Sequence, residues 1–383
     1  MLGIRYWLVM TIGMTGTMEG ETLLAEVMGR DAGVWGVAAD ARWEVQVRWV
    51  REDGSVHEFR VDDGAYFYPA STVKLPTVLM AFERLEALRV AGVTRDSEMI
   101  SGREFSWQTA VTRDGSAESG RPSVGHYAKK VFLVSDNDAH NRLYELVGQE
   151  RLNRELGERG YAGVRILHRL AVGEEPWQGQ LTNPVRFYDG GGKLLVALEA
   201  QRSVGDFSAG REILRGEKHW WKGTLFERPM DFGEKNALPL RAQQEMLRAL
   251  VDPGGDGGWR ISEADRAFLL EVMGQYPSAV EWPEYDAEEY PDGYAKFLIC
   301  GGREAAPEGV TVRNKSGLAY GFITDNAYVE DAGSGARFFL AAVISVNVNG
   351  VYNDNDYAYK EVALPFMKRL GELVLEYERG AKE

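Results

Sequence analysis

The sequence is poor in cysteine and histidine. Its 383 residues include one cysteine, Cys300, so no internal disulfide can form. Five scattered histidines and no second cysteine provide no recognisable spacing of metal ligands. The sequence therefore predicts no metal site and implies no cofactor.

Positive charge is also scarce relative to negative charge. The chain has 44 Lys and Arg against 58 Asp and Glu, a net charge of -14. This balance argues against nucleic acid or an anionic membrane surface as the main partner. Hydrophobic residues make up 44% of the chain, enough to bury a substantial core in one large domain or two. We expect a monomeric globular protein, and the charge balance does not indicate its substrate.

Long hydrophobic runs are absent, but the first 18 residues resemble a secretory signal peptide. Arg5 precedes a short apolar run at 6–14, which is too short to anchor the chain in a bilayer. No Ala-x-Ala cleavage site follows it. We expect a periplasmic or secreted protein, and the alternative is a disordered or wrongly assigned start.

The remaining chain predicts strands at both ends and helices in the middle. Residues 21–61 and 258–383 are predicted to form one α/β sheet domain. Residues 62–257 are predicted to form a helical domain. Within it, 172–236 is interpreted as an enlarged loop because it lacks enough regular elements to hold a core of its own. The predicted strands are 34–50, 55–61, 310–313, 321–329 and 337–348.

Ser71 and Lys74 begin a predicted helix and lie on the same face of it. The positive end of the helix dipole and burial both disfavour a proton on the lysine. A neutral amine beside a hydroxyl is a general base beside a nucleophile. A Ser-x-x-Lys string occurs by chance about once in a chain of this length, so a helix cap followed by a surface lysine is the alternative.

Ser135-Asp136-Asn137 lies between two predicted helices, where a short loop can direct side chains into a cleft. In acyl transfer the Ser135 hydroxyl can relay a proton to a leaving nitrogen, and the Asn137 amide can hold the substrate's own amide. Because Ser, Asp and Asn all favour turns and helix caps, a purely structural loop is the alternative.

Lys315-Ser316-Gly317 follows a predicted strand, on what we expect to be a sheet edge lining the cleft. Lys315 and Ser316 there would bind a carboxylate, and Gly317 would let substrate approach closely. The backbone amide of Leu318 can pair with that of Ser71 as an oxyanion hole. A solvated lysine on an edge strand is the alternative.

Taken together, these three motifs resemble those of the class A β-lactamases, within the wider group of penicillin-recognising serine hydrolases. The resemblance covers roughly 240 residues and includes the segment from Phe67 to Lys74. It implies an α+β fold in which an antiparallel sheet flanked by helices lies beside an all-helical domain. It also implies that Ser71 is acylated, Lys74 is a base for acylation, and Ser135 relays a proton to the β-lactam nitrogen. Asn137 would hold the substrate amide, and Lys315 with Ser316 would bind its carboxylate.

The sequence departs from that family where the acyl-enzyme is hydrolysed. The family uses a glutamate in a Glu-x-x-Leu-Asn string, which is absent here. We expect Glu175, before Pro176, to replace this glutamate, and Glu227 or Glu234 could serve instead. The alternative is that Glu175 is a plain surface charge. The enlarged loop at 172–236 also carries tryptophans that would change what can enter the cleft.

Three functions therefore stay open. The leading hypothesis is a β-lactamase that hydrolyses its acyl-enzyme with a loop carboxylate. The second is a D-alanyl peptidase, amidase or esterase with the same acyl chemistry. The third is a penicillin-binding module that captures β-lactams or cell-wall peptides without hydrolysing them.

Overall fold

The structure is a computed structural model that describes residues 23–173, 175–254 and 258–382. The signal-like segment at 1–18 lies outside the described residues. Within the described ranges, no helix combines the length and the apolar character that a membrane span requires.

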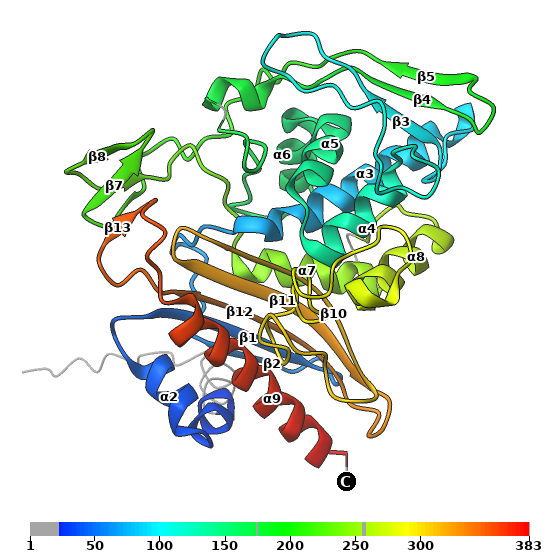
Figure 1. Cartoon of the computed structure of the whole chain (residues 1–383). Helices are drawn as coiled ribbons and strands as arrows, with labels where there is room; N and C mark the ends of the chain where they lie inside the picture. The colour runs from blue at the N-terminus through cyan, green and yellow to red at the C-terminus, as the bar shows by residue number, and fades with distance from the viewer. Residues whose placement is uncertain (1–22, 174, 255–257, 383) are drawn as a thin grey trace, which may run out of the picture.

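A five-stranded antiparallel sheet joins the two ends of the chain (Figure 1). Its strand order is β10-β11-β12-β1-β2, so the N-terminal strands pair with the C-terminal ones through β1 and β12. This sheet confirms the predicted α+β architecture, and it places β10 at one edge. The strands are β1 (Glu44–Arg51), β2 (Val56–Phe59), β10 (Val310–Ala319), β11 (Phe322–Asp331) and β12 (Arg337–Ser345).

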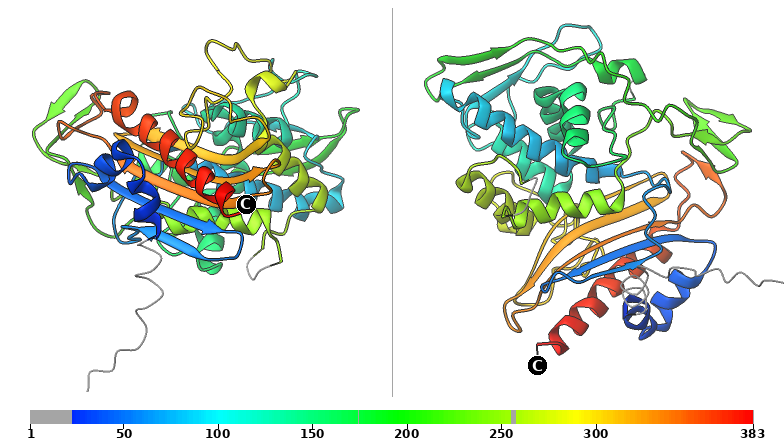
Figure 2. Two further views of the ribbon diagram at one scale, coloured as in Figure 1. Left: turned by 90° about the horizontal axis from the view of Figure 1, so that it is seen from below. Right: turned by 180° about the vertical axis from the view of Figure 1, so that it is seen from behind.

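Helices cover both faces of the sheet (Figure 2). On one face, α2 (Ala32–Ala39) and α9 (Leu364–Gly380) bury a core with the inward side chains of the strands. On the other, Leu240 of α7 (Leu240–Val251) packs against Ala341 and Val343 of β12. Because both faces are covered, β11 is buried along most of its length instead of alternating between core and solvent.

The first predicted strand is wrong over its N-terminal half. Residues 32–39 form the helix α2, and the strand begins only at Glu44. Asp31 caps this helix, and its side chain accepts hydrogen bonds from the amides of Gly33 and Val34. The continuous apolar run that follows carries no clear period, so its composition alone favours a strand as much as a helix.

Helices in the middle of the chain surround a second core. The helix α3 lies inside this group, and 11 of its 15 residues are buried. These helices lie above the sheet in Figure 1, and the edge strand β10 contacts the turn that leads into α3. They are α3 (Lys74–Leu88), α4 (Val124–Val134), α5 (Asn137–Val147), α6 (Gln149–Glu158), α7 and α8 (Glu263–Gly274).

The enlarged loop at 172–236 contains more regular structure than the sequence predicts. Six short strands form here, and they pair with one another and with strands outside the loop. Runs of two to five residues are too short to show a period, which is why the pattern fails to predict them. The strands are β4 (Val185–Tyr188) and β5 (Leu194–Leu198), on β3 (Glu98–Ser101); β6 (Leu214–Arg215), on β9 (Met230–Asp231); and β7 (Lys218–Trp221) and β8 (Thr224–Phe226), on β13 (Val351–Tyr352).

Candidate active site

Ser71 lies in a tight turn at the start of α3. The turn is a 3-10 segment, Ala70–Val73, in which the amide and hydroxyl of Thr72 both donate to the Pro69 carbonyl oxygen, at 3.0 and 2.7 Å. Ala70, directly before Ser71, has a φ of 48°. A left-handed alanine costs about 1 to 3 kcal/mol and persists only where the surroundings impose it. Holding Ser71 in this position therefore lowers the stability of the fold.

Lys74 is completely buried and contacts the Ser135-Asp136-Asn137 loop. Its Nζ donates to Asn137 Oδ1 at 2.7 Å, to Ser135 Oγ at 3.2 Å and to the Ser135 carbonyl oxygen. Burial, followed by the positive charge of Lys315, holds the pKa of Lys74 well below its usual value. A lysine amine in this environment can accept a proton near neutral pH.

The Ser135-Asp136-Asn137 loop is shaped by the two helices that it joins. Ser135 ends α4 in the left-handed conformation, with a φ of 57°. Asp136 caps α5, and its carboxylate accepts from the amide of Ala139 at 2.8 Å. Asn137 is the first residue of that helix. The prediction of a loop between helices is confirmed, and the loop directs Ser135 and Asn137 toward Lys74.

A second buried lysine, Lys315 of β10, reaches the same hydroxyl from the opposite side. Its Nζ lies 2.9 Å from Ser135 Oγ and 2.7 Å from the Ser316 carbonyl oxygen. Burial lowers the pKa of Lys315 to about 7, and the carboxylate of Asp325 partly opposes this shift. Ser135 Oγ therefore lies between two amines that can exchange protons with it.

The edge of β10 lies against the turn that carries Ser71. A Cβ added at Gly317 would lie 2.4 Å from the Ser71 nitrogen, so only glycine permits this approach. A two-residue hairpin between Ala319 and Phe322 joins β10 to β11. From this pair onward, opposite residues of the two strands alternate between hydrogen-bonded and non-hydrogen-bonded pairs. By this alternation the amide of Leu318 points away from β11, toward the open edge. Leu318 and Ser71 can thus present two amides to one oxygen, as an oxyanion hole requires.

The Ser316 hydroxyl on β10 is held by a hydrogen bond to the backbone. Its hydroxyl donates to the Ala295 carbonyl oxygen at 2.6 Å, and its side chain is almost completely buried. Successive side chains of a strand point to opposite faces, so Ser316 and Lys315 project in opposite directions. The predicted role of Ser316 in binding a carboxylate would require this hydroxyl to rotate out of its present bond.

Glu175 lies at the surface in this structure. Its carboxylate pairs with Lys222 Nζ at 2.8 Å, and both side chains are about half exposed (47% and 64%). Glu227 pairs with Lys218 on the same hairpin, whereas Glu234 borders the cavity described below. No contact joins Glu175 to the buried lysines among the residues that the structure describes.

Asn141 of α5 holds the backbone of Leu170, which lines the cavity described below. Its side-chain amide donates to the Leu170 carbonyl oxygen at 3.0 Å and accepts from the Leu170 amide at 2.8 Å. Asn141 is four residues after Asn137 and lies on the same helix face. Sequence reasoning missed this pair, although the spacing from Asn137 was the available signal.

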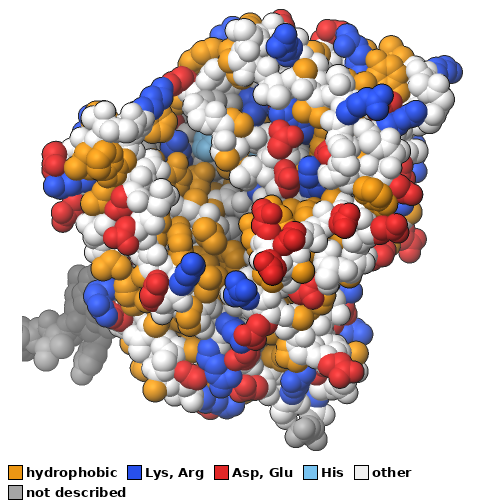
Figure 3. Space-filling view, viewed as in Figure 1, with side chains coloured by type: hydrophobic (Ala, Val, Ile, Leu, Met, Phe, Trp, Pro, Cys, Tyr) orange, Lys and Arg blue, Asp and Glu red, His pale blue; other side chains and the backbone are white. Residues whose placement is uncertain are grey.

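A cavity of about 660 Å³ extends from Tyr68 and Tyr320 to the enlarged loop. Figure 3 shows a hollow with many hydrophobic side chains between the β7–β8 hairpin, at the left, and the rest of the molecule. Trp221 of that hairpin is 37% exposed and lines this cavity. A space of this size can hold a drug-sized molecule or a large acyl group.

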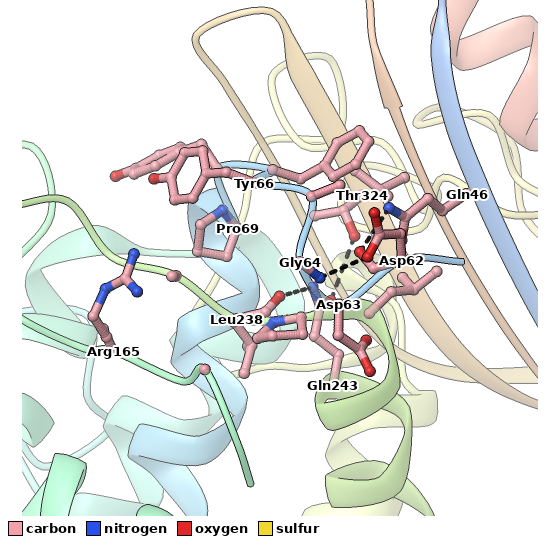
Figure 4. A pocket seen from close by; sticks show the side chains of 18 of the residues that line it. Gln46, Asp62, Asp63, Gly64, Tyr66, Pro69, Arg165, Leu238, Gln243 and Thr324 are labelled. Carbon is pink, nitrogen blue, oxygen red and sulfur yellow. Dashed lines mark hydrogen bonds between the residues drawn. The ribbon is translucent and has the colours of Figure 1, made fainter. Parts of the chain in front are cut away.

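A smaller cavity, about 150 Å³, lies behind the segment that leads to Ser71 (Figure 4). Here Gln46 Nε2 donates to the Asp62 carbonyl oxygen at 3.1 Å, and Asp62 Oδ1 accepts from the Gly64 amide at 2.8 Å. The bond from Gln46 attaches Asp62 to β1, and the bond between Gly64 and Asp62 fixes the turn there. Both help to fix the segment that ends at Ser71.

Between sheet and helices, the fold therefore presents a Ser-x-x-Lys turn, a Ser-Asp-Asn loop and a Lys-Ser-Gly edge strand, the arrangement of β-lactamase-like proteins. The profile of the beta-lactamase enzyme family matches residues 35–273, more than half of the chain, and the chain belongs to this family. A search of curated proteins found no match.

Solved structures agree with this assignment at the level of the fold. PBP-A is 16% identical, with a TM-score of 0.52 over 93% of this chain and 95% of its own. A β-lactamase from Sphaerobacter thermophilus DSM 20745 is 13% identical, with a TM-score of 0.52 over 92% and 97%. One from Xanthomonas campestris pv. campestris str. ATCC 33913 is 16% identical, with a TM-score of 0.52 over 94% and 98%.

Proposed function

We propose that this protein is a serine hydrolase of the β-lactamase type, acylated at Ser71 by amides that carry a carboxylate, β-lactams among them. The observation that carries the proposal is the pair of buried amines on Ser135 Oγ, with Lys74 Nζ at 3.2 Å and Lys315 Nζ at 2.9 Å. Burying two lysines is costly, and such perturbed groups cluster at functional sites.

In this scheme Ser71 Oγ attacks the carbonyl carbon while Lys74, as a neutral amine, takes its proton. The amides of Ser71 and Leu318 stabilise the oxyanion, and each such donor contributes about 10²- to 10³-fold in rate. Ser135 then passes a proton to the leaving nitrogen. Lys315, when protonated, holds the substrate carboxylate, and Asn137 holds the substrate amide with the Nδ2 group that faces away from Lys74.

Turnover of a chromogenic cephalosporin tests this function. We expect the purified protein to open the β-lactam ring and Ser71→Ala to abolish the reaction. Absence of both turnover and covalent labelling in the wild-type protein would contradict β-lactam chemistry altogether.

A second candidate is a D-alanyl peptidase or a penicillin-binding module of the same family. It is favoured by the position of Glu175, which pairs with Lys222 at the surface, and by the apolar Leu170 on the segment that Asn141 holds beside the site. A leucine-to-glutamate mutant of PBP-A, 17% identical with a TM-score of 0.53, was solved as an acyl-enzyme complex with penicillin G. A protein of this fold can thus be trapped with penicillin bound covalently.

Release of D-alanine from a D-alanyl-D-alanine peptide separates the two candidates. Fast peptide cleavage with a long-lived penicillin adduct would favour the peptidase, and fast penicillin turnover would favour the β-lactamase. Both substrates would be met outside the cytoplasm, in line with the export that the first 18 residues predict.

A further inference from the structure

A third buried lysine, Lys296, lies behind the strand that carries Lys315. Its Nζ donates to the carbonyl oxygens of Val312 and Met273, at 2.7 and 2.8 Å, and to Asn314 Oδ1 at 3.2 Å. These three acceptors match the three hydrogens of an ammonium group. Burial lowers the pKa of Lys296 to about 8, so the group keeps its proton at pH 7. The fold thus holds a positive charge in its interior that the catalytic scheme above does not use.

A buried carboxylate, Asp325 of β11, binds the same asparagine. Asn314 Nδ2 donates to Asp325 Oδ1 at 2.8 Å, while Asn314 Oδ1 accepts from Lys296, so one side-chain amide joins the two charged groups. Asp325 Oδ2 accepts from the backbone amides of Phe297 and Leu298, at 2.9 and 3.0 Å. Burial raises the pKa of Asp325, and the hydrogen bonds from these N–H donors oppose that shift because they favour the ionised carboxylate.

This network holds Lys315 from behind. Asn314 and Ser316 project from one face of β10, and Lys315 between them projects from the other. The Ala295 carbonyl oxygen accepts from Asn314 Nδ2 at 2.8 Å and from Ser316 Oγ at 2.6 Å, so one atom is bonded to both neighbours of Lys315. Because Lys296 follows Ala295 directly, the bonds of Lys296 help to fix this atom and, with it, the Lys315 backbone.

The two buried charges act on Lys315 in opposite directions. Burial is the largest cause that lowers the pKa of Lys315 to about 7; the carboxylate of Asp325 raises this pKa, and the ammonium of Lys296 lowers it. Other titratable or charged side chains surround Lys315 and these two partners: Lys74 of α3, Asp136 of the Ser-Asp-Asn loop, His140 of α5, Arg313 of β10 and Cys300.

We propose that Lys296 and Asp325 are positioning residues for acylation: the two buried charges fix the strand segment that carries Lys315 and set the charge that Lys315 presents to the substrate carboxylate. The proposal rests on the proposed function. The ammonium of Lys296 makes it easier for Lys315 to pass a proton to Ser135, and the carboxylate of Asp325 keeps enough charge on Lys315 to hold the substrate. Both residues bind the face of β10 opposite to Ser135, so they act through Lys315.

Acylation by penicillin G and by its methyl ester tests this role, with second-order rate constants measured from about pH 5.5 to about pH 9. The ester lacks the carboxylate, so the quotient of the two rate constants follows the fraction of Lys315 that carries a proton. In the wild-type protein we expect this quotient to fall as pH rises, with a midpoint near the Lys315 pKa of about 7.

Two single variants should move this midpoint in opposite directions. Lys296→Met removes a positive charge and should raise the midpoint by about one pH unit, whereas Asp325→Asn removes a negative charge and should lower it by about one. A merely damaged site would change the size of the quotient without producing opposite shifts. Lys368→Met is the control, because it removes a lysine of α9 that pairs with Glu304, and it should leave the midpoint unchanged.

A double variant guards against loss of the fold. Each single variant leaves an unbalanced charge in the core, so we expect each to be less stable than wild type. Lys296→Met combined with Asp325→Asn removes both charges. This variant should be more stable than either single variant, and its midpoint should return to near the wild-type value.

A midpoint that stays at the wild-type value in the single variants, or that moves the same way in both, would overturn the proposal. A double variant whose midpoint remains with either single variant would overturn it too, as would a wild-type quotient that does not fall with pH. In all three cases acylation itself would leave the proposed function standing. Absence of acylation by both compounds in the wild-type protein would overturn the proposed function as well.

Discussion

Gly317→Ala is expected to separate the two amides of the oxyanion hole. The added Cβ would lie 2.4 Å from the Ser71 nitrogen, 3.0 Å from the Thr72 nitrogen and 3.1 Å from the Ala70 Cβ. Two of these atoms are backbone, so the edge of β10 or the Ser71 turn must move. Reaching 3.0 Å needs a shift of about 0.6 Å, comparable to displacements that cost 10²-fold in rate.

The expected loss is about 10²- to 10³-fold in the acylation rate, equivalent to about 2.7 to 4 kcal/mol of barrier. Overpacking should also lower the free energy of unfolding by about 1 to 3 kcal/mol. Stopped-flow acylation by a chromogenic cephalosporin and thermal unfolding measure the two effects.

Gly157→Ala is the matched control, because an added Cβ there, on the exposed side of α6, meets nothing within 4 Å. It should leave acylation unchanged and add about 0.5 to 1 kcal/mol of stability. If Gly317→Ala were acylated at the wild-type rate, an oxyanion hole at this edge would be refuted.

Three further results are expected. For a penicillin, kcat/KM should fall as pH rises above about 7, because Lys315 loses the proton with which it holds the carboxylate; the penicillin methyl ester, measured in parallel, should show no such fall. Glu175→Gln should leave the adduct lifetime unchanged, since Glu175 pairs with Lys222 at the surface; a lifetime that lengthens would make Glu175 the base. Trp221→Ala should lower the acylation rate of penicillin G relative to that of 6-aminopenicillanic acid, which lacks the acyl side chain. Trp35→Ala, similarly exposed on α2, is the control and should preserve the ratio of the two rates. An equal ratio in both variants would exclude the cavity from substrate binding.

The motif residues could be predicted because their chemistry is encoded locally. Ser71 and Lys74 share one turn of chain, and Ser135 and Asn137 share another, so spacing alone indicates their relation. Their meeting with Lys315, 180 residues after Ser135, followed from the family resemblance and is present in the structure. The predicted strands at both ends of the chain, together with the family resemblance, likewise predicted the α+β fold.

The rest depends on contacts between residues far apart in the sequence. Asn141 holds Leu170 across 29 residues. Its spacing from Asn137 indicates the helix face that the two share, but it does not indicate that Leu170 is its partner. The outward pairing of Glu175 likewise depends on Lys222, which belongs to a hairpin too short to show a strand period.

The central claim is that Ser71 is the acylated nucleophile. Intact-mass measurement after incubation with penicillin G, followed by peptide mapping, tests it most directly. We expect a mass increase equal to one whole penicillin molecule, located on the peptide that contains Ser71 and absent from Ser71→Ala. An adduct on another residue, or one that persists in Ser71→Ala, would contradict this assignment.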